Sequence, residues 1–485
     1  MRRRNQLVAF ALAIASIFTF VAGPARAGGP GKWTKLSTTS QKADGFDQPS
    51  AVRTADGELH VVYRIKPATT TYNIRWVTIS QAGKMLASGN VLPSNWNTID
   101  TELVLLPDGS GGLRVVFMGT QDTNPSNFFS TGSVYTATSA NGQAWTLPMV
   151  SLAQHTVLNG DFGAAAELNG TPVTAFGLNA TTWFHEGTDA SAPAGAPDGS
   201  IMQTSTIDNE GEAVATNGDG SVWLAWWRWT DAATQGYYVE QILPGQGSPM
   251  EAPNSGNKDE DNSPKQRVAL AARKGGGVYM AYCSPTKTKP CAHVSLWKVG
   301  AGKAATVPGT TSGNARLVTL VPGGAGRLWI LWWDSVKSRI DVVRTGTNGS
   351  GFGPVLSIKP PPNWALFEHL SAEGSSGRVD ILANIVSGAA GNPVEIWHTQ
   401  LLPGMKLTAK PAAFGHATGA TVTFVVTDAG QPVAGAKVAC LGHSGTTNAK
   451  GVVKLHFGTG TASGPHVAVA TKGGYSQAKV TVKVT

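Results

Sequence analysis

Leu328-Trp-Ile-Leu-Trp332 is a short apolar run that follows a glycine-rich turn, Pro322-Gly-Gly324, and ends in an aromatic residue. Versions of this run recur along the chain, and consecutive copies end 50 to 59 residues apart. Repeats of about fifty residues that hold several short strands are typical of the blades of a β-propeller. The seven copies span 59–63, 113–117, 172–176, 222–226, 278–282, 328–332 and, in degenerate form, 379–383.

Further strand-like segments surround each copy. A shorter apolar segment and a turn precede it, and a third segment such as Ile74-Arg-Trp-Val-Thr78 follows it. These segments are apolar on both faces, as expected where each blade lies between two neighbours. We therefore predict an all-β fold with a seven-bladed β-propeller, and a six-bladed propeller is the alternative.

The two ends of the repeat array indicate a closed ring. The seventh repeat leaves little room for an outer strand before the next domain begins near Lys406. Trp33-Thr-Lys-Leu-Ser37, ahead of the first repeat, has the pattern of an orphan outer strand. Because closure removes an exposed sheet edge, we predict that 33–37 pairs with 394–399 in the seventh blade.

The first 27 residues are typical of a signal peptide. Arg2, Arg3 and Arg4 precede an apolar run at 7–21, and Ala25-Arg-Ala27 provides small residues for cleavage. The run is too short to span a membrane, and no later segment has eighteen apolar residues in succession. We predict a secreted protein with a bacterial-type Sec signal peptide at 1–27, a β-propeller at 28–404 and a second domain at 405–485.

The charge of the chain argues against a nucleic-acid partner. The formal net charge is +8 at pH 7, but without residues 1–27 the chain keeps 34 basic and 30 acidic residues. No dense run of lysine or arginine occurs outside the signal peptide. Nucleic-acid-binding proteins usually carry a strong basic patch, so we expect neither a nucleic-acid partner nor a membrane span. The sequence predicts no oligomeric state.

The three cysteines fit an exported protein. Cys283 and Cys291 bracket a loop of seven residues, and we predict a disulfide that pins the neck of this loop. Cys440 lies in an apolar strand pattern, so we predict a buried free thiol there. The spacing of the three cysteines gives no zinc signature.

Two segments carry a family resemblance. Thr138-Ser-Ala-Asn-Gly-Gln-Ala-Trp145 and Thr345-Gly-Thr-Asn-Gly-Ser-Gly-Phe352 resemble the S-x-D-x-G-x-x-W hairpins, or Asp-boxes, of sialidase-like propellers, although both lack the aspartate. Both fall between the third and fourth strands of a repeat, where such hairpins belong. The resemblance implies a propeller of the sialidase-like superfamily with Asp-box (BNR) repeats. If the chain is an enzyme, it implies a glycoside hydrolase.

The C-terminal residues carry a second resemblance. Residues 422–438, followed by Thr447-Asn-Ala-Lys-Gly-Val452, resemble bacterial Ig-like domains of the invasin type. Alternating apolar and polar residues at 421–426 and 479–484 independently favour strands with one buried face. The resemblance implies an Ig-like β-sandwich at 405–485 that acts as a spacer or an adhesive stalk.

One aligned position of the repeats, eight to ten residues before the turn glycine, is polar in every copy. It begins the innermost strand, so these side chains are expected to ring one mouth of the central channel. Three residues that follow two positions later point the same way. The catalytic candidates are Asp47, Asp100, Asp161, Glu210 and Glu368, and the ligand-binding candidates are Gln266, Asn314, Glu102, Glu212 and Arg316.

Three roles are open for this ring. Paired carboxylates perform acid–base chemistry in glycoside hydrolysis. Oxygen ligands also bind hard cations, so a Ca²⁺ ion at the channel mouth is the alternative to our expectation of no cofactor. A carboxylate at the start of each inner strand could instead cap backbone N–H groups and fasten adjacent blades. The amides Gln266 and Asn314, with Arg267 and Arg316 nearby, make the ring asymmetric, which favours a binding site.

Loops at the same mouth bring further aromatic and charged side chains. Exposed aromatic rings stack on the apolar faces of sugars, and polar groups bind the sugar hydroxyls. Alternatively, the aromatic residues only pack their own loops. The candidates are Arg64, Trp96, Trp229, Trp364 and His369.

Together these features predict a secreted, carbohydrate-active protein whose propeller mouth binds a glycan or cell-surface polysaccharide. No standard catalytic motif is present, so a hydrolase and a lectin-like binder both remain open. The alternative is a non-catalytic adhesion or scaffold protein, with the propeller as a protein-binding platform and the Ig-like domain as its stalk.

Overall fold

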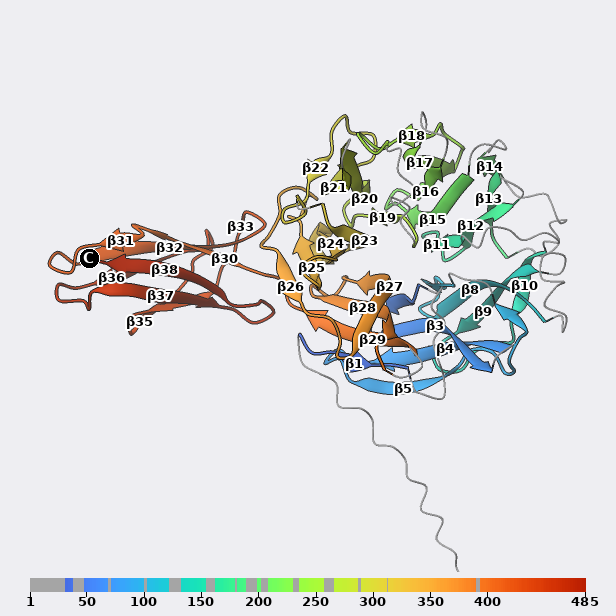
Figure 1. The fold of residues 1–485 in the computed structure, drawn as a ribbon, viewed down its shortest axis with the longest axis horizontal. Coiled ribbons are helices and arrows are strands. Elements are labelled where there is room, and N and C mark those ends of the chain that lie inside the picture. The colour runs from blue at the N-terminus through green and yellow to red at the C-terminus, as the bar shows by residue number, and fades with distance from the viewer. Residues whose placement is uncertain are drawn as a thin grey trace, which may run out of the picture.

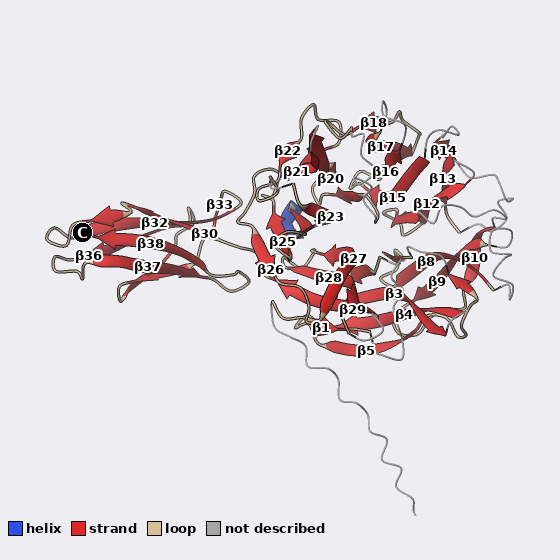
Figure 2. Cartoon of the chain, in the orientation of Figure 1, coloured by secondary structure: helices blue, strands red, loops and turns tan. Residues whose placement is uncertain are grey.

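The structure is a computed structural model, and Figure 1 shows its ribbon. The signal peptide predicted at 1–27 lies outside the residues that the structure describes. Within those residues, regular structure consists of strands and one 3₁₀ turn, η3 (Gly324–Gly326), as Figure 2 shows. The described residues are 31–37, 48–68, 71–99, 103–121, 132–153, 162–178, 181–188, 199–201, 208–229, 235–256, 266–286, 289–311, 313–389 and 393–485.

Each repeat forms one antiparallel sheet, numbered here as a blade and given from its innermost strand outward. Blade 1 consists of β2 (Ser50–Arg53), β3 (Leu59–Ala68), β4 (Thr71–Ile79) and β5 (Met85–Asn90). Blade 2 consists of β6 (Thr98–Ile99) and β7 (Val104–Pro107), then β8 (Leu113–Thr120), β9 (Ser133–Ser139) and β10 (Met149–Ala153). Blade 3 consists of β11 (Phe162–Ala166), β12 (Pro172–Leu178), β13 (Thr181–Glu186) and β14 (Gly199–Ile201). Blade 4 is β15 (Asp208–Thr216), β16 (Val222–Trp229), β17 (Gly236–Leu243) and β18 (Met250–Glu251); blade 5 is β19 (Ala269–Ala272), β20 (Val278–Thr286), β21 (Lys289–Lys298) and β22 (Ala305–Thr306); blade 6 is β23 (Ala315–Pro322), β24 (Leu328–Asp334), β25 (Arg339–Arg344) and β26 (Leu356–Ile358); blade 7 is β27 (Trp364–Glu373), β28 (Val379–Ser387), β29 (Val394–Leu401) and β1 (Thr34–Lys35).

The seven sheets of the described chain surround a common centre, as in a seven-bladed β-propeller (Figure 1). Their innermost strands contact one another in the cyclic order β2, β7, β11, β15, β19, β23, β27 and back to β2. The fold is therefore all-β, and the seven repeats of the sequence correspond to the seven sheets.

β24 shows why the recurring strand is apolar on both faces. All seven of its residues are buried. Ile330 and Trp332 pack in a cluster with blade 5, whereas the alternate residues Trp329, Leu331 and Trp333 pack in a cluster with blade 7. Because successive side chains of a strand point to opposite faces, a strand between two blades is apolar at successive positions, and in β24 the one charged residue is Asp334 at its end.

The ring closes through the N-terminal strand, as predicted. β1 pairs antiparallel with β29, with Thr34 opposite His398 and Lys35 opposite Trp397. The side chain of Lys35 adds an ion pair of 2.5 Å with Glu395. Blade 7 thus takes three strands from the end of the repeat array and one from its beginning.

A buried charged cluster lies at the seam between blades 7 and 1. Asp380 is almost fully buried and accepts hydrogen bonds from Arg53 at 2.5 Å and from His398 at 2.9 Å. Arg53 also pairs with Glu373 at 2.8 Å, and Arg378 lies 3.3 Å from Asp380. Burial opposes ionisation, but the bond to His398 and the neighbouring cations outweigh it and hold the pKa of Asp380 below its usual 3.8.

The two segments that resemble Asp-boxes form turns between the third and fourth strands of blades 2 and 6. In each turn an asparagine accepts backbone hydrogen bonds. The side-chain oxygen of Asn141 accepts from Gln143 and Ala144 at 3.0 Å, and that of Asn348 accepts from Ser350 at 3.1 Å. Asparagine side chains commonly stabilise turns in this way.

The C-terminal residues form a separate β unit of two sheets around one core of apolar side chains, including Phe424 and Phe457. One sheet is β30-β32-β33 with β36 paired to β32, and the other is β31-β38-β37-β34-β35. The strands are β30 (Lys406–Lys410), β31 (Ala413–Phe414), β32 (Ala420–Asp428), β33 (Gln431–Pro432), β34 (Lys437–Cys440), β35 (His443–Thr446), β36 (Val452–Phe457), β37 (Gly464–Thr471) and β38 (Ala478–Val484).

This C-terminal unit is joined to blade 6 by a buried ionic contact. Asp428, at the end of β32, pairs with Arg344 of β25, and Arg327 lies 3.4 Å from the same carboxylate. The hydroxyl of Tyr475 lies 3.4 Å from Asp428, and Gln431 accepts a bond of 2.7 Å from Arg327. Figure 1 shows the unit projecting from the rim of the propeller beside β25 and β26. The described part of the chain contains no helix long and apolar enough to cross a membrane.

Candidate functional site

The innermost strands of all seven blades surround a polar cavity of ≈ 170 Å³ on the propeller axis. Small side chains from several blades line it, including Ser50, Ala164, Ala213, Ala269 and Ser371. This volume is below the roughly 300 Å³ at which small-molecule pockets begin. A sugar ligand would therefore bind over the mouth of the channel rather than inside it.

Arg267 bridges the channel from blade 5 to blades 1 and 2. Its Nε donates to the side-chain oxygen of Gln48 at 3.0 Å, and its Nη1 donates to the carbonyl of Leu103 at 3.2 Å. Its backbone N–H also donates to Gln48, at 3.2 Å. One guanidinium thus links the segments that enter inner strands on opposite sides of the axis.

Gln266, predicted as a ligand-binding residue, fastens three blades together. Its side chain is 3% exposed. The amide nitrogen donates to the carbonyl of Val318 at 3.0 Å and to the hydroxyl of Thr319 at 3.1 Å, and the amide oxygen accepts from the backbone of Leu370 at 3.0 Å. These three bonds give Gln266 a structural role, in which a polar residue at the start of an inner strand fastens adjacent blades.

Glu212 is placed in the same way, in the neighbouring blade 4. It lies on β15, is fully buried and accepts a bond of 3.0 Å from the hydroxyl of Thr182 in blade 3. The pairing of β15 with β16 is irregular between Glu210 and Ala213. Glu210 is half-buried at this irregularity, so it stays the more accessible of the two carboxylates.

Two other candidates also belong to the interior. Trp96 is 3% exposed, and its ring packs 5.4 Å from that of Phe117 and 4.7 Å from that of Tyr135. Arg64 is buried, donates to the carbonyl of Ile99 and lies over the ring of Tyr72. Neither side chain is open to a sugar, so the expected ligand contacts of Trp96 and Arg64 are replaced by packing between blades 1 and 2.

The mouth over blades 6 and 7 is different, because several candidates remain accessible there. Arg316 is exposed beside a break in the pairing of β23, where Leu317 has a positive φ of 50°. Glu368 is half-buried at a second break, in the pairing of β27 with β28, and His369 follows it at 7% exposure. Both irregularities turn polar side chains out of regular sheet positions.

Trp364 provides a partly exposed aromatic surface at this mouth. Its ring lies edge-on at 5.0 Å from that of Trp333 and tilted at 5.6 Å from that of Phe367, both of which are buried. Trp333 stands opposite Arg316 in the pairing of β24 with β23. Trp333 and Phe367 thus hold Trp364 in place next to the segment that carries Arg316. Sequence reasoning missed Trp333, although it directly follows the aromatic end of the sixth repeat.

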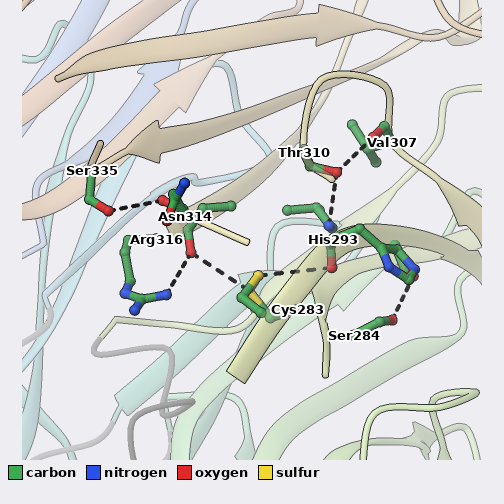
Figure 3. The surroundings of a disulfide bond; sticks show 12 residues. Cys283, Ser284, His293, Val307, Thr310, Asn314, Arg316 and Ser335 are labelled. Atoms are coloured by element: carbon green, nitrogen blue, oxygen red, sulfur yellow. Dashed lines mark hydrogen bonds between the residues drawn. A yellow bond between two sulfur atoms is a disulfide. The ribbon is translucent and has the colours of Figure 1, made fainter. Parts of the chain in front are cut away.

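A disulfide joins Cys283 and Cys291 with an S–S distance of 2.09 Å, as the sequence predicts, and pins the hairpin between β20 and β21. Figure 3 shows that this hairpin neighbours the start of β23. The sulfur of Cys283 lies 3.9 Å from the carbonyl oxygen of Ala315, and this oxygen accepts a hydrogen bond from Arg316 at 3.2 Å. The carbonyl of Asn314 accepts from the backbone of Ser335 at 3.1 Å. The disulfide and Ser335 therefore support the segment 314–316 from two sides.

The remaining candidates lie outside the described residues: Asp47, Asp100, Glu102, Asp161 and the side chain of Trp229. Among the described residues, no group of three or more His, Cys, Asp or Glu side chains is placed to hold a metal ion. The described part of the mouth thus offers Trp364, Arg316, Glu368, Glu210 and Asn314 for contact with a ligand, whereas His369 is buried.

Comparisons with known proteins assign no family. No family model matches the chain, and no curated protein matches it. Among solved structures, the chain is similar to the β-propeller domain of the Trilobed protease from Pyrococcus furiosus (8% identity, TM-score 0.42, covering 75% of this chain and 94% of that one). It is also similar to a PL25 ulvan lyase (10% identity, TM-score 0.44, covering 76% of this chain and 95% of that one). A third similar structure is the Aleuria aurantia lectin (9% identity, TM-score 0.37, covering 87% of this chain and 98% of that one). Similarity at this level assigns no function to the chain.

Proposed function

We propose that the protein is a secreted carbohydrate-binding protein whose glycan ligand lies over the propeller mouth at blades 6 and 7. The observation that carries the proposal is the half-buried Trp364, which Trp333 and Phe367 hold beside the exposed Arg316. An indole face stacks on the apolar face of a sugar ring, and a guanidinium donates to its hydroxyl or carboxylate groups.

On the described residues alone, binding has more support than hydrolysis. A glycosidase needs two carboxyl groups on either side of one glycosidic bond. Of the polar positions around the channel, Gln266 and Glu212 have buried partners in neighbouring blades, which supports a fastening role for this part of the ring. Glu368 and Glu210 are the accessible carboxylates of the described chain at the mouth, on blades 7 and 4.

We also propose a superfamily for the propeller, a domain type for the C-terminal unit and a route of export. The positions of the Asn141 and Asn348 turns support a distant member of the sialidase-like superfamily, in which asparagine takes over the turn-stabilising role of the missing aspartate. The two-sheet C-terminal unit supports an Ig-like domain at 405–485 that follows a propeller at 28–404. The Cys283–Cys291 disulfide supports export by a signal peptide at 1–27.

A glycan array probed with the mature chain tests the proposal. We expect binding to at least one glycan class, and we expect Trp364→Ala combined with Arg316→Gln to abolish it while the melting temperature falls by only a few degrees. The control is Leu168→Ala combined with Lys303→Gln, which changes exposed residues at other places on the propeller and should leave binding intact.

Two outcomes would contradict the proposal. One is the absence of any glycan bound by the mature chain, which would favour the adhesion or scaffold alternative. The other is release of reducing sugar from the bound glycan, abolished by Glu368→Gln, which would identify a hydrolase instead of a binder.

A further inference from the structure

Charge is divided unequally between the two parts of the chain. Residues 405–485 contain eight lysines, no arginine and a single acidic residue, Asp428, which gives this part a formal charge of +7. Residues 28–404 contain 26 basic and 29 acidic residues, so the propeller is slightly negative. The modest overall charge of the mature chain hides this division.

The one acidic group of the C-terminal unit does not reach its surface. Asp428 is 1% exposed and is paired with Arg344 and Arg327 of blade 6. Seven of the eight lysines are exposed, and Lys472 is half-buried. No acidic side chain of this unit, which is described in full, is therefore available to neutralise its surface lysines.

The lysines lie on the outer faces of both sheets. On the first sheet, Lys410 stands opposite Thr423, which in turn stands opposite Lys454, and Lys406 lies four residues before Lys410 on the same face. On the second sheet, Lys479 and Lys483 lie on β38 and Lys437 lies on β34. The inward residues between them, such as Leu407, Leu455 and Val482, are buried in the core.

We propose that the C-terminal unit binds an anionic polysaccharide, through carboxylate or sulfate groups along the polymer. Lysine is a compact point charge that binds such groups without fixed geometry. Because lysines cover both faces, a flexible polymer can contact them together, whereas a flat bilayer can meet only one face. This binding surface is separate from the propeller mouth, and it does not depend on the function proposed for that mouth.

The aromatic residues favour a polysaccharide over a nucleic acid. Proteins that bind single strands stack bases on exposed aromatic rings, and specific contacts to duplex bases mostly come from arginine. The C-terminal unit has no arginine, and Phe414, Phe424 and Phe457 are buried in its core. Tyr475 is held under Arg344 and Lys472.

The test measures binding of the mature, full-length chain to immobilised polygalacturonate, with neutral dextran as the blank. We expect binding at low salt that is lost as sodium chloride screens the charges. The variant Lys406→Gln, Lys410→Gln, Lys454→Gln should bind about tenfold more weakly, since each lysine near an anionic surface contributes about 1 kcal/mol at most. The variant Lys437→Gln, Lys479→Gln, Lys483→Gln should show a comparable loss.

The matched control removes the same number of charges from the propeller. Lys84→Gln, Lys298→Gln, Lys303→Gln changes three exposed lysines and should leave polygalacturonate binding unchanged. An equal loss in this control, or no loss in either C-terminal variant, would overturn the proposal. So would tighter binding to duplex DNA or to phosphatidylglycerol vesicles than to polygalacturonate. A salt-sensitive dimer that either C-terminal variant abolishes would also overturn it, because the partner would then be a second copy.

Discussion

Gln266 explains why an amide replaces a carboxylate at one place in the ring of polar residues. Its side chain donates to the carbonyl of Val318 and accepts from the N–H of Leu370. An ionised carboxylate has no proton to donate, so it could make only the second of these bonds. Gln48 directly follows the aligned position of blade 1 and makes a similar pair of bonds, since it donates to the carbonyl of Leu370 at 2.8 Å and accepts from Arg267.

Replacing Gln266 by glutamate should therefore destabilise the propeller. The new carboxylate would face the carbonyl of Val318 in a buried position, and we expect the free energy of unfolding to fall by about 3 kcal/mol. Urea denaturation at pH 7 measures the difference. The same substitution at the exposed Gln143 is the control and should change stability by less than about 0.5 kcal/mol. Equal stability of the two variants would contradict the fastening role.

Asp380 makes the seam between blades 7 and 1 sensitive to acid. Because its pKa is lowered in the folded chain, the ionised form stabilises the fold above the usual value of 3.8, and this stabilisation is lost as pH falls below it. We expect Asp380→Asn to lower the free energy of unfolding by about 3 kcal/mol at pH 7. The difference from wild type should shrink as pH falls below 3.8.

Denaturant unfolding of both proteins across the acidic range measures this effect. Asp56→Asn is the control: the pKa of Asp56 is also lowered, chiefly by a bond from Thr54, but Asp56 is exposed and its loss should change stability little. A difference between wild type and Asp380→Asn that stays constant down to pH 2 would contradict the assignment.

At the scale of single elements, the sequence predicts strands well and side-chain roles poorly. The recurring run predicts β24 and its equivalents because burial on both faces leaves an unmistakable apolar pattern. The segment 33–37 predicts closure because it has the pattern of an outer strand and the seventh repeat leaves little room for its own. In contrast, Trp96 and Arg64 looked like loop residues at the mouth, yet their partners Phe117 and Ile99 lie in the next blade. Contacts between blades leave no local pattern that would separate a packed residue from an exposed one.

The β20–β21 hairpin gives a prediction that thiol chemistry can check. The unreduced chain in denaturant should show one reactive thiol, that of Cys440, because Cys283 and Cys291 are joined. The native chain should show almost none, since Cys440 is 3% exposed and burial raises the pKa of its thiol. Titration with a chromogenic disulfide reagent measures both states. Three thiols in the unreduced, denatured chain would mean that the hairpin is not bridged.

At the scale of the whole molecule, the position of the C-terminal unit depends on a few buried groups. Arg344 and Arg327 of blade 6 both face Asp428, and the ring of Tyr475 lies 5.7 Å from the guanidinium of Arg344. Besides these groups, Gln431 forms hydrogen bonds with Arg327 and Thr347 of blade 6. The unit also follows blade 7 through a short connection, where the backbone N–H of Ser476 donates to the carbonyl of Pro403 at 2.9 Å. A buried ion pair that loses one partner leaves an uncompensated charge, which hydration would relieve.

Asp428→Ala should therefore release the C-terminal unit from blade 6 without unfolding either part. Leaving Arg344 and Arg327 buried without their partner costs about 3–5 kcal/mol. Undocking removes this cost because it hydrates both guanidinium groups. Small-angle X-ray scattering of the full chain should show a larger radius of gyration and a broader distribution of distances than in wild type. Gln477→Ala, on the exposed surface of the same unit, is the control and should leave the scattering unchanged. Identical profiles for wild type and Asp428→Ala would show that the packing of Gln431 and the connection at 402–405 suffice to hold the two parts together.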